Sequence, residues 1–417
     1  MKGDEVIAEG TIVVEGNRIS AVGPASAVDV PGDAVRVDAA GKTIIPGLVD
    51  VHAHVFYNAY ELFPQEKWQF IANLAYGVTT AYDPSAHSLD AFPQAELVEA
   101  GEMLGPRIYS SGDVIYGTLV FPSMYAQIST IDDARHIVRK FKEYGALELK
   151  QYLQPTRIKR QLLVQAARES GVRITAEGGA DMYLDLSMVA DGYTAFEHPF
   201  PIAPLYHDIV EFMARSGTYY TPTLIVAYGG LTAEDYFYGK DNHHDDPKVR
   251  RFVPEEVLDW HRRRSIAPEE EYHFKDVAAS AAAIARAGGK VCLGAHGQLQ
   301  GLGAQWELWA LAMGGLPNLE VLREATLNGA EKLGLEQDLG SLERGKLADF
   351  MVLDANPLED IHNSQKIRYV VKNGFVYDAA SMTELWPERK SLQKFFWMTD
   401  ADGKRFAAPE PARLGNP

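Results

Sequence analysis

Two histidines separated by one residue, His52 and His54, are the side chains best placed for chemistry. They follow an apolar run, residues 44–51, which is broken only by Asp50 and predicts a buried strand. Because side chains alternate between the faces of a strand, both imidazoles project the same way from its carboxyl end. Two neutral imidazoles placed in this way suit a borderline metal such as zinc. A hydrogen-bonded pair of loop histidines is the alternative, and the buried strand favours the metal.

Composition excludes several classes of protein. The chain has 417 residues, 46% of them hydrophobic and 23% charged, which is typical of a globular enzyme. Its net charge of −17 disfavours nucleic acid as a partner. With Cys292 as the single cysteine it forms no internal disulfide. It also lacks the ~18 continuous apolar residues of a membrane span and, in residues 1–10, a secretory signal. We therefore expect a cytoplasmic protein that acts on a small-molecule substrate, with no nucleic-acid or membrane partner.

Strand-like and helix-like segments alternate through the middle of the chain. Predicted helices lie at about 130–144, 156–170 and 269–288, and the first has a hydroxyl cap at Thr130 followed by acids. Predicted strands lie at about 45–54, 77–83, 106–113, 146–152, 172–177, 193–198, 218–226 and 290–296. This order predicts an α/β fold, a (β/α)8 TIM barrel with its chemistry at the carboxyl ends of the strands.

The two flanks of this barrel have a different pattern. Short alternating strands are predicted at 11–19, 34–37, 348–353 and 370–376. Each flank is too short to bury a core alone, so we expect residues 1–45 and 339–382 to pair into one small β-sandwich. The barrel then spans residues 46–338, and residues 383–417 are expected to form an extended tail.

The stretch 227–268 follows the seventh predicted strand and is therefore expected over the mouth of the barrel. A lid that buries an apolar or aromatic substrate and offers cations to an acidic group is one interpretation of it, and a contact between subunits of a homo-oligomer is the other. By contrast, the polar loop at His243 and His244 is expected to be solvated. The residues that suggest a lid or contact are Tyr228, Tyr236, Phe237, Tyr238, Phe252 and Trp260, interleaved with Arg250, Arg251, Arg262, Arg263 and Arg264.

Four motifs together resemble the amidohydrolase superfamily of metal-dependent hydrolases. They are residues 46–54 (PGLVDVHAH), 77–80 (GVTT), 325–330 (ATLNGA) and 340–349 (GSLERGKLAD). The resemblance covers nearly the whole chain and implies a (β/α)8 barrel with a β-sandwich built from both flanks. It is greatest to amidohydrolase regions found downstream of propeller-like domains. Such proteins usually begin with a strand before the turn found here at residues 1–4, so we expect a missing edge strand or a longer parent protein.

The resemblance also implies further metal ligands at other strand ends. His198, at the end of the sixth predicted strand, matches a usual histidine ligand. Lys150 ends the fourth, in phase with Glu148 and Tyr152. Many relatives carboxylate a lysine there and use it to bridge two metals, which requires a neutral amine. An ordinary surface lysine is the alternative.

Two strand ends depart from the family pattern. Glu177 stands where a histidine is usual, and an anionic oxygen there favours manganese or iron more than an all-imidazole site does. A glutamate paired with a nearby cation is the alternative. His296 stands where hydrolytic relatives carry an aspartate that binds metal and takes a proton from water. An imidazole can do either, but not both through one nitrogen.

We therefore expect a metal-dependent hydrolase that cleaves an amide or another carbon–nitrogen bond with metal-activated water. One or two divalent ions, zinc first with manganese or iron as alternatives, would be held by His52, His54, Lys150, Glu177, His198 and His296. His296 would also serve as a catalytic group, with Tyr228 as a donor to the developing oxyanion. Dinuclear non-haem iron oxygen chemistry on the same barrel and metal binding without turnover are the alternative functions.

Overall fold

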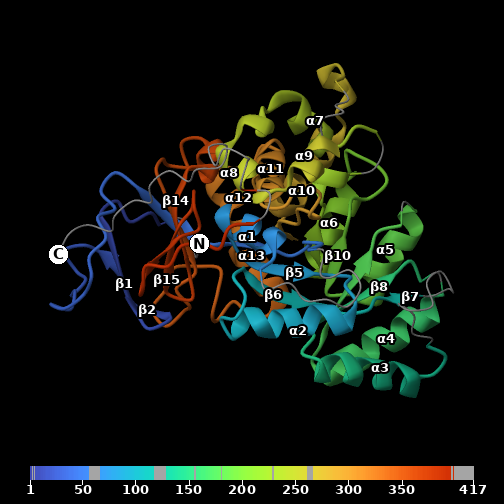
Figure 1. The fold of residues 1–417 in the computed structure, drawn as a ribbon. Helices are drawn as coiled ribbons and strands as arrows, with labels where there is room; N and C mark the ends of the chain where they lie inside the picture. The colour runs from blue at the N-terminus through green and yellow to red at the C-terminus, as the bar shows by residue number, and fades with distance from the viewer. Residues whose placement is uncertain are drawn as a thin grey trace.

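The structure, a computed structural model, describes residues 1, 3, 5–55, 66–116, 128–154, 156–179, 181–227, 230–260, 266–395 and 398. Parallel strands accompanied by helices make up most of these residues. Antiparallel strands from the two ends of the sequence, blue and red in Figure 1, lie together on one side of the helices. The predicted α/β class is therefore confirmed.

The parallel strands form two hydrogen-bonded sheets that meet beside the predicted histidine pair. Val51 N donates to Leu293 O at 3.1 Å, and this bond joins the strand before His52 to the segment after the last parallel strand. One sheet has the order β4 (Leu48–Asp50), β5 (Val78–Asp83), β6 (Arg107–Ser110). The other has the order β12 (Lys290–Val291), β11 (Tyr219–Thr221), β10 (Ala195–Glu197), β9 (Arg173–Glu177), β8 (Glu148–Tyr152), β7 (Ile115–Tyr116).

Asp50 is the single polar residue in the apolar run that ends at the histidines, and hydrogen bonds to its carboxylate explain why it can be buried. Its Oδ1 accepts hydrogen bonds from the backbone N–H groups of His52 and Ala295, each at 3.1 Å. A buried carboxylate must be satisfied in this way to be tolerated. Asp50 therefore connects β4 to the chain that follows β12.

Helices follow most of the parallel strands, and the predicted caps explain where some of them begin. Thr130 accepts a hydrogen bond from Asp133 N while the Asp133 carboxylate accepts one from Thr130 N, a capping box that starts α3. None of the helices in the described part of the chain is long and apolar enough to cross a membrane. The α-helices are α1 (Trp68–Ala75), α2 (Ser88–Glu99), α3 (Ile131–Glu143), α4 (Arg157–Ser170), α5 (Met182–Asp191), α6 (His207–Ser216), α7 (Ala233–Lys240), α8 (Pro247–Phe252), α9 (Glu255–Trp260), α10 (Phe274–Arg286), α11 (Leu302–Ala312), α12 (Asn318–Glu324) and α13 (Leu327–Leu333).

The antiparallel strands bring the two flanks of the sequence together. β3 (Thr43–Pro46) pairs with β13 (Phe350–Leu353), which starts the row β13, β14 (Ile367–Lys372), β15 (Phe375–Asp378), β16 (Glu384–Trp386). β1 (Gly10–Glu15) and β2 (Arg18–Pro24) form a separate hairpin. Ile19 of β2 packs with Phe350 and Tyr369, so apolar contacts also join the flanks. The division at residues 45, 338 and 382 into sandwich, barrel and tail stays a prediction.

Two expectations for the flanks are wrong. Residues 34–37 form no strand, and Val35 and Val37 are exposed, because alternation alone does not supply a neighbouring strand to pair with. Residues 384–386, expected in the extended tail, form β16, since their backbone pairs with β15.

Three aromatic residues of the stretch 227–268 belong to the core of this chain. Phe237, Tyr238 and Phe252 are buried, and the Phe237 ring stacks on Trp306 with centroids 5.5 Å apart. These three are therefore neither lid nor subunit contact as expected. His243, expected in a solvated loop, is also buried, because Trp306 and Tyr238 pack against its ring. Tyr228 lies outside the described residues.

A buried ion pair joins the parallel and antiparallel parts of the molecule. Arg107 of β6 donates from Nε to Asp349 Oδ2 at 3.0 Å, and Asp349 Oδ1 also accepts from Asn373 N at 2.6 Å. Both charged side chains are buried. Breaking this pair at Asp349 removes the buried partner of Arg107 and leaves it only the exposed carboxylate of Glu99, at 3.2 Å, which is costlier than losing a surface attraction.

We predict that Asp349→Ala lowers the free energy of unfolding by about 3 kcal/mol, measured by equilibrium urea denaturation. The matched control is Asp338→Ala, which removes a carboxylate from the half-exposed pair with Arg18 and should cost at most about 1 kcal/mol. Equal losses for the two variants would contradict this assignment of the buried pair.

Candidate metal centre

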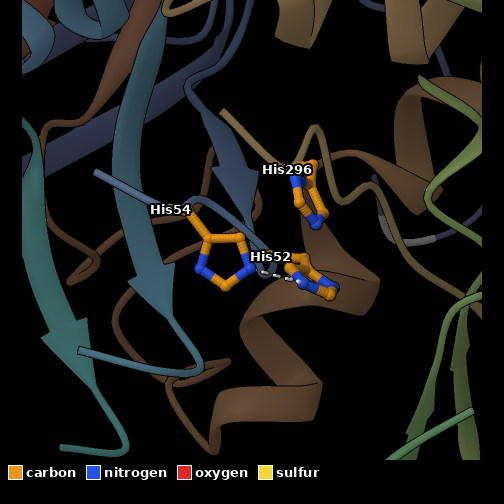
Figure 2. A group of neighbouring side chains, drawn as sticks. All are labelled: His52, His54 and His296. Carbon is orange, nitrogen blue, oxygen red and sulfur yellow. Dashed lines mark hydrogen bonds between the residues drawn. The ribbon is translucent and has the colours of Figure 1, made fainter. Parts of the chain in front are cut away.

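Three imidazoles face one another where β4 ends and the chain leaves β12. His52 and His54 follow β4, and His296 follows β12 (Figure 2). The two segments are held by backbone bonds, including His54 N to His296 O at 3.0 Å, and by a parallel bridge between Ala53 and His296. Ring centroids are 4.6 Å apart for His54 and His296, and 4.9 Å apart for His52 and His54. The backbone pairing therefore brings together histidines that are more than 240 residues apart in sequence.

Each of these rings has its Nδ1 atom engaged by a neighbouring oxygen. His54 Nδ1 lies 3.2 Å from Asp83 Oδ1, and His296 Nδ1 lies 3.0 Å from the amide oxygen of Gln298. His52 Nδ1 lies 3.3 Å from the hydroxyl of Thr223, which donates to Thr221 O. Oxygen acceptors at Nδ1 place the proton there and leave the Nε2 lone pair available. One ring nitrogen from each of the three histidines lies within 4.8 Å of the others.

Burial keeps His52, His198 and His296 neutral. Burial, followed by the positive charge of Lys150, holds the pKa of His52 well below its usual range. Burial, followed by the effect of His54, lowers the pKa of His296 to about 3. Burial, followed by Lys150, also lowers the pKa of His198. Neutral imidazole is the form that binds a metal, so at neutral pH the cluster is ready to act as a ligand set.

The other predicted ligands lie beside the three histidines. His198, directly after β10, has its ring centroid 4.8 Å from that of His52. Its Nε2 is 3.3 Å from Oε1 of Glu177, which ends β9. The second oxygen of Glu177 is 2.6 Å from Nζ of Lys150 on β8. The structure therefore brings all six predicted metal residues into one group, in which His54 and His296 are half-buried and the other four are buried.

Lys150 is paired with two carboxylates, Glu177 and Glu197. Its ammonium donates a very short hydrogen bond to Glu197 as well as contacting Glu177. Burial alone would lower the pKa of Lys150, but these two carboxylates raise it above its usual value. The alternative of an ordinary surface lysine is therefore wrong, since the side chain is fully buried.

A second buried lysine, Lys332 of α13, extends this network of charges. Its Nζ lies 2.9 Å from Glu148 Oε2 and 3.0 Å from Glu197 Oε1. Glu197 and Glu177 are direct partners in the register of β10 and β9, so two like charges are held side by side by the lysines. The network thus has three carboxylates but only two ammonium groups, and it lies next to imidazoles. This excess of carboxylates suits the addition of a cation.

The backbone around the site is unusual at the ends of three strands. His198, Thr223 and His296 have φ values of 69°, 50° and 61°, a left-handed conformation that side chains with a Cβ rarely adopt. Close packing adds a further constraint, because a Cβ on Gly294 would lie 2.7 Å from that of His52. Strain of this kind is tolerated where the surrounding structure holds a functional geometry.

Several residues of the site were not found from the sequence. Glu197 stands directly before His198, and Asp83 ends a buried strand as Asp50 does, so a charged residue at a strand end was an available signal for both. Thr223 and Lys332 gave no such signal. Their positions depend on how the chain folds back onto β4.

The residues present fit a divalent metal ion. Imidazole nitrogens with free lone pairs and an adjacent carboxylate are the donors that zinc, manganese and iron accept in proteins. Oxygen partners at the opposite ring nitrogens orient such ligands, and all three clustered histidines have one. The cluster of His52, His54 and His296 could therefore bind a metal.

Comparisons with known proteins agree with this picture. The model of the amidohydrolase family matches residues 43–376. An enamidase of Eubacterium barkeri is 41% identical over 76 residues, 18% of this chain and 19% of the enamidase. An imidazolonepropionase of Rhizobium rhizogenes is 43% identical over 56 residues, 13% of this chain and 14% of that protein. The chain thus matches less than a fifth of the length of either relative.

A solved structure extends the similarity in fold. A Xaa-Pro dipeptidase with methionine bound in its active site superposes with a TM-score of 0.67 at 21% identity, over 90% of this chain and 97% of that one. Together with the family match, this similarity supports an α/β fold of the TIM-barrel type. The family match covers most of the sequence, and the histidine cluster lies within it. The chain therefore belongs to the amidohydrolase family.

Proposed function

We propose that this protein is a metal-dependent hydrolase that cleaves an amide or another carbon–nitrogen bond of a small molecule. The observation that carries the proposal is the convergence of one nitrogen each from His52, His54 and His296, with the opposite nitrogen of each ring engaged. Family membership and relatives named as enamidase and imidazolonepropionase support the reaction class. We also propose that the protein assembles into a homo-oligomer.

The metal site proposed here includes His52, His54, His198, His296 and Glu177, with Lys150 beside them. Zinc is the first choice, and the oxygen donor Glu177 makes manganese or iron the alternatives. A bound divalent ion supplies a water of lowered pKa and polarises a carbonyl group.

His296 suits the role of ligand better than that of base. Its Nδ1 is engaged by Gln298, so a ligand role for Nε2 leaves no lone pair to take a proton. Asp83 and Thr223 are proposed to orient His54 and His52 in the same way as Gln298 orients His296. A role for Tyr228 as oxyanion donor stays a prediction.

We propose that the two parallel sheets close into a single eight-stranded barrel. Bonds between residues 51–54 and 293–296 join β4 to the segment after β12. At the other junction, β6 and β7 are separated by only four residues, and they pair with β5 and β8 respectively. One strand interrupted between Ser110 and Ile115 therefore accounts for both sheet edges.

We predict that removal of metal with a chelator abolishes hydrolysis across a panel of amides and cyclic amides, and that one or two equivalents of zinc per chain restore it. Metal content measured by atomic emission, with oxygen uptake followed in parallel, separates the alternatives. Iron together with substrate-dependent oxygen consumption would support the oxygenase instead. Stoichiometric metal with no turnover on amide, ester and lactone panels would support a metal-binding protein without catalysis.

Glu177→Ala should reduce metal occupancy after equilibration with a limiting metal buffer, because it removes the carboxylate nearest His198. Loss of an oriented ligand typically costs at least ~10-fold in affinity. The control is Glu359→Ala, which removes an exposed glutamate whose side chain bonds only to the half-buried Asn356 in the described structure. Wild-type occupancy and activity in Glu177→Ala would remove Glu177 from the site.

Carboxylation of Lys150, implied by the family resemblance, can be tested without an activity assay. Metal-loaded protein equilibrated with ¹³C-bicarbonate should show one carbamate carbon in its NMR spectrum, and Lys150→Met should lack it. A wild-type spectrum without this signal would leave Lys150 as the ammonium counter-ion of Glu177 and Glu197.

A further inference from the structure

A buried glutamate outside the proposed ligand set, Glu307 of α11, binds two backbone groups with its two oxygens. Oε1 accepts from Leu224 N and Oε2 accepts from Ile225 N, each at 2.9 Å. These residues begin the short 3-10 helix Leu224–Val226, which follows β11. They lie 83 and 82 residues before Glu307 in the sequence. The first N–H groups of a helix lack partners within it, so the carboxylate satisfies both.

The turn that Glu307 binds is strained. Thr223, which directly precedes the two N–H groups, has a φ of 50°. A β-branched residue rarely adopts the left-handed region and persists there only when its surroundings hold it. Two hydrogen bonds from the next two residues to Glu307 provide such a hold, and they are charge-assisted in the ionised form of Glu307, whose pKa burial raises to about 8.

Thr223 is also the residue that contacts His52. Its hydroxyl lies 3.3 Å from His52 Nδ1 and donates to Thr221 O, so the oxygen is left to accept the imidazole proton. That arrangement leaves the Nε2 lone pair of His52 directed toward His54, whose Nε2 is 3.1 Å away. A connected series of contacts therefore runs from Glu307 through the turn to one of the three clustered imidazoles.

We propose that Glu307 is a positioning residue for the metal centre, acting through the turn at Thr223 on the orientation of His52. The inference rests on the proposed metal binding and goes beyond it, because Glu307 touches neither the histidines nor any residue of the proposed ligand set. It acts by holding Thr223 in its left-handed conformation, so that the hydroxyl accepts from His52 Nδ1.

A matched control exists on the neighbouring helix. Glu324 of α12 is also fully buried, and neither of its oxygens has a hydrogen-bond partner among the described residues. Glu→Gln preserves size in both places. At position 307 the new amide N–H₂ opposes one of the two backbone N–H groups, whereas at position 324 it meets no bonded group.

The experiment compares the zinc affinity of wild-type protein, Glu307→Gln and Glu324→Gln by competition with a chromophoric chelator. We expect Glu307→Gln to bind zinc about tenfold more weakly and Glu324→Gln to match wild type within twofold. The visible spectrum of the cobalt-loaded protein should change only for Glu307→Gln, since it reports ligand geometry. Unchanged affinity and spectrum in Glu307→Gln would overturn the proposal.

A second variant tests the route through the turn. Thr223→Val keeps the branched shape and removes only the hydroxyl, and it should weaken zinc binding about as much as Glu307→Gln does. The double variant should bind zinc with about the affinity of the single variant that binds it less tightly, because both changes act on the same contact. If the two losses of zinc affinity multiplied in the double variant, the route through Thr223 would be contradicted.

The outcome for wild type separates this inference from the proposed function. Wild-type protein that binds zinc and hydrolyses no amide would refute the proposed hydrolase while the affinity comparison still decides the role of Glu307. Wild-type protein that binds no zinc would overturn both.

Discussion

The structure of the site depends on one constraint: each clustered imidazole has its Nδ1 atom committed to an oxygen. Asp83, Thr223 and Gln298 supply these oxygens to His54, His52 and His296. Because an imidazole has only two nitrogens, this commitment decides which nitrogen is available to a ligand. Burial then holds the pKa values of His52 and His296 below their usual range, which keeps these two rings uncharged at neutral pH. Orientation and protonation state thus favour the same outcome, three lone pairs directed at one region.

The network of buried charges behind the histidines follows from the same need for satisfied polar groups. Glu177 and Glu197 are neighbours in the register of two parallel strands, an arrangement that like charges oppose. Lys150 contacts both, and Lys332 of the last helix contacts Glu197 from the other side. Removing either lysine would leave a buried carboxylate without an ammonium partner, Glu177 in the case of Lys150 and Glu148 in the case of Lys332, so the network also fixes the relative positions of β8, β9, β10 and α13.

Much of the fold and part of the site could be predicted from the sequence. The spacing of His52 and His54, the hydroxyl cap at Thr130 and the alternation of strands with helices are local patterns, and local rules describe them well. Residues 34–37 show where such rules fail, since a strand also needs a partner strand. The expectations for Phe237 and His243 were wrong for a related reason, because the Trp306 ring that packs on both lies more than 60 residues away in the sequence.

The residues that orient the ligands were the least predictable. Thr223 and Glu307 belong to elements that meet only when α11 packs against the end of β11, and neither residue type is distinctive in its own segment. Family resemblance pointed to the ligands at the strand ends, and the alternative for Glu177, pairing with a nearby cation, is found at Lys150. In this chain Glu177 contacts both His198 and Lys150, which makes it a connection between the histidines and the buried charges.

The most direct test of this account is a diffraction experiment on zinc-loaded crystals at the zinc absorption edge. The account predicts an anomalous peak bound by the Nε2 atoms of His52, His54 and His296, at about the 2.0–2.1 Å typical of zinc–imidazole bonds. Their Nδ1 atoms should still contact Thr223, Asp83 and Gln298. Zinc bound through the Nδ1 atoms, or bound elsewhere with these three rings empty, would contradict it.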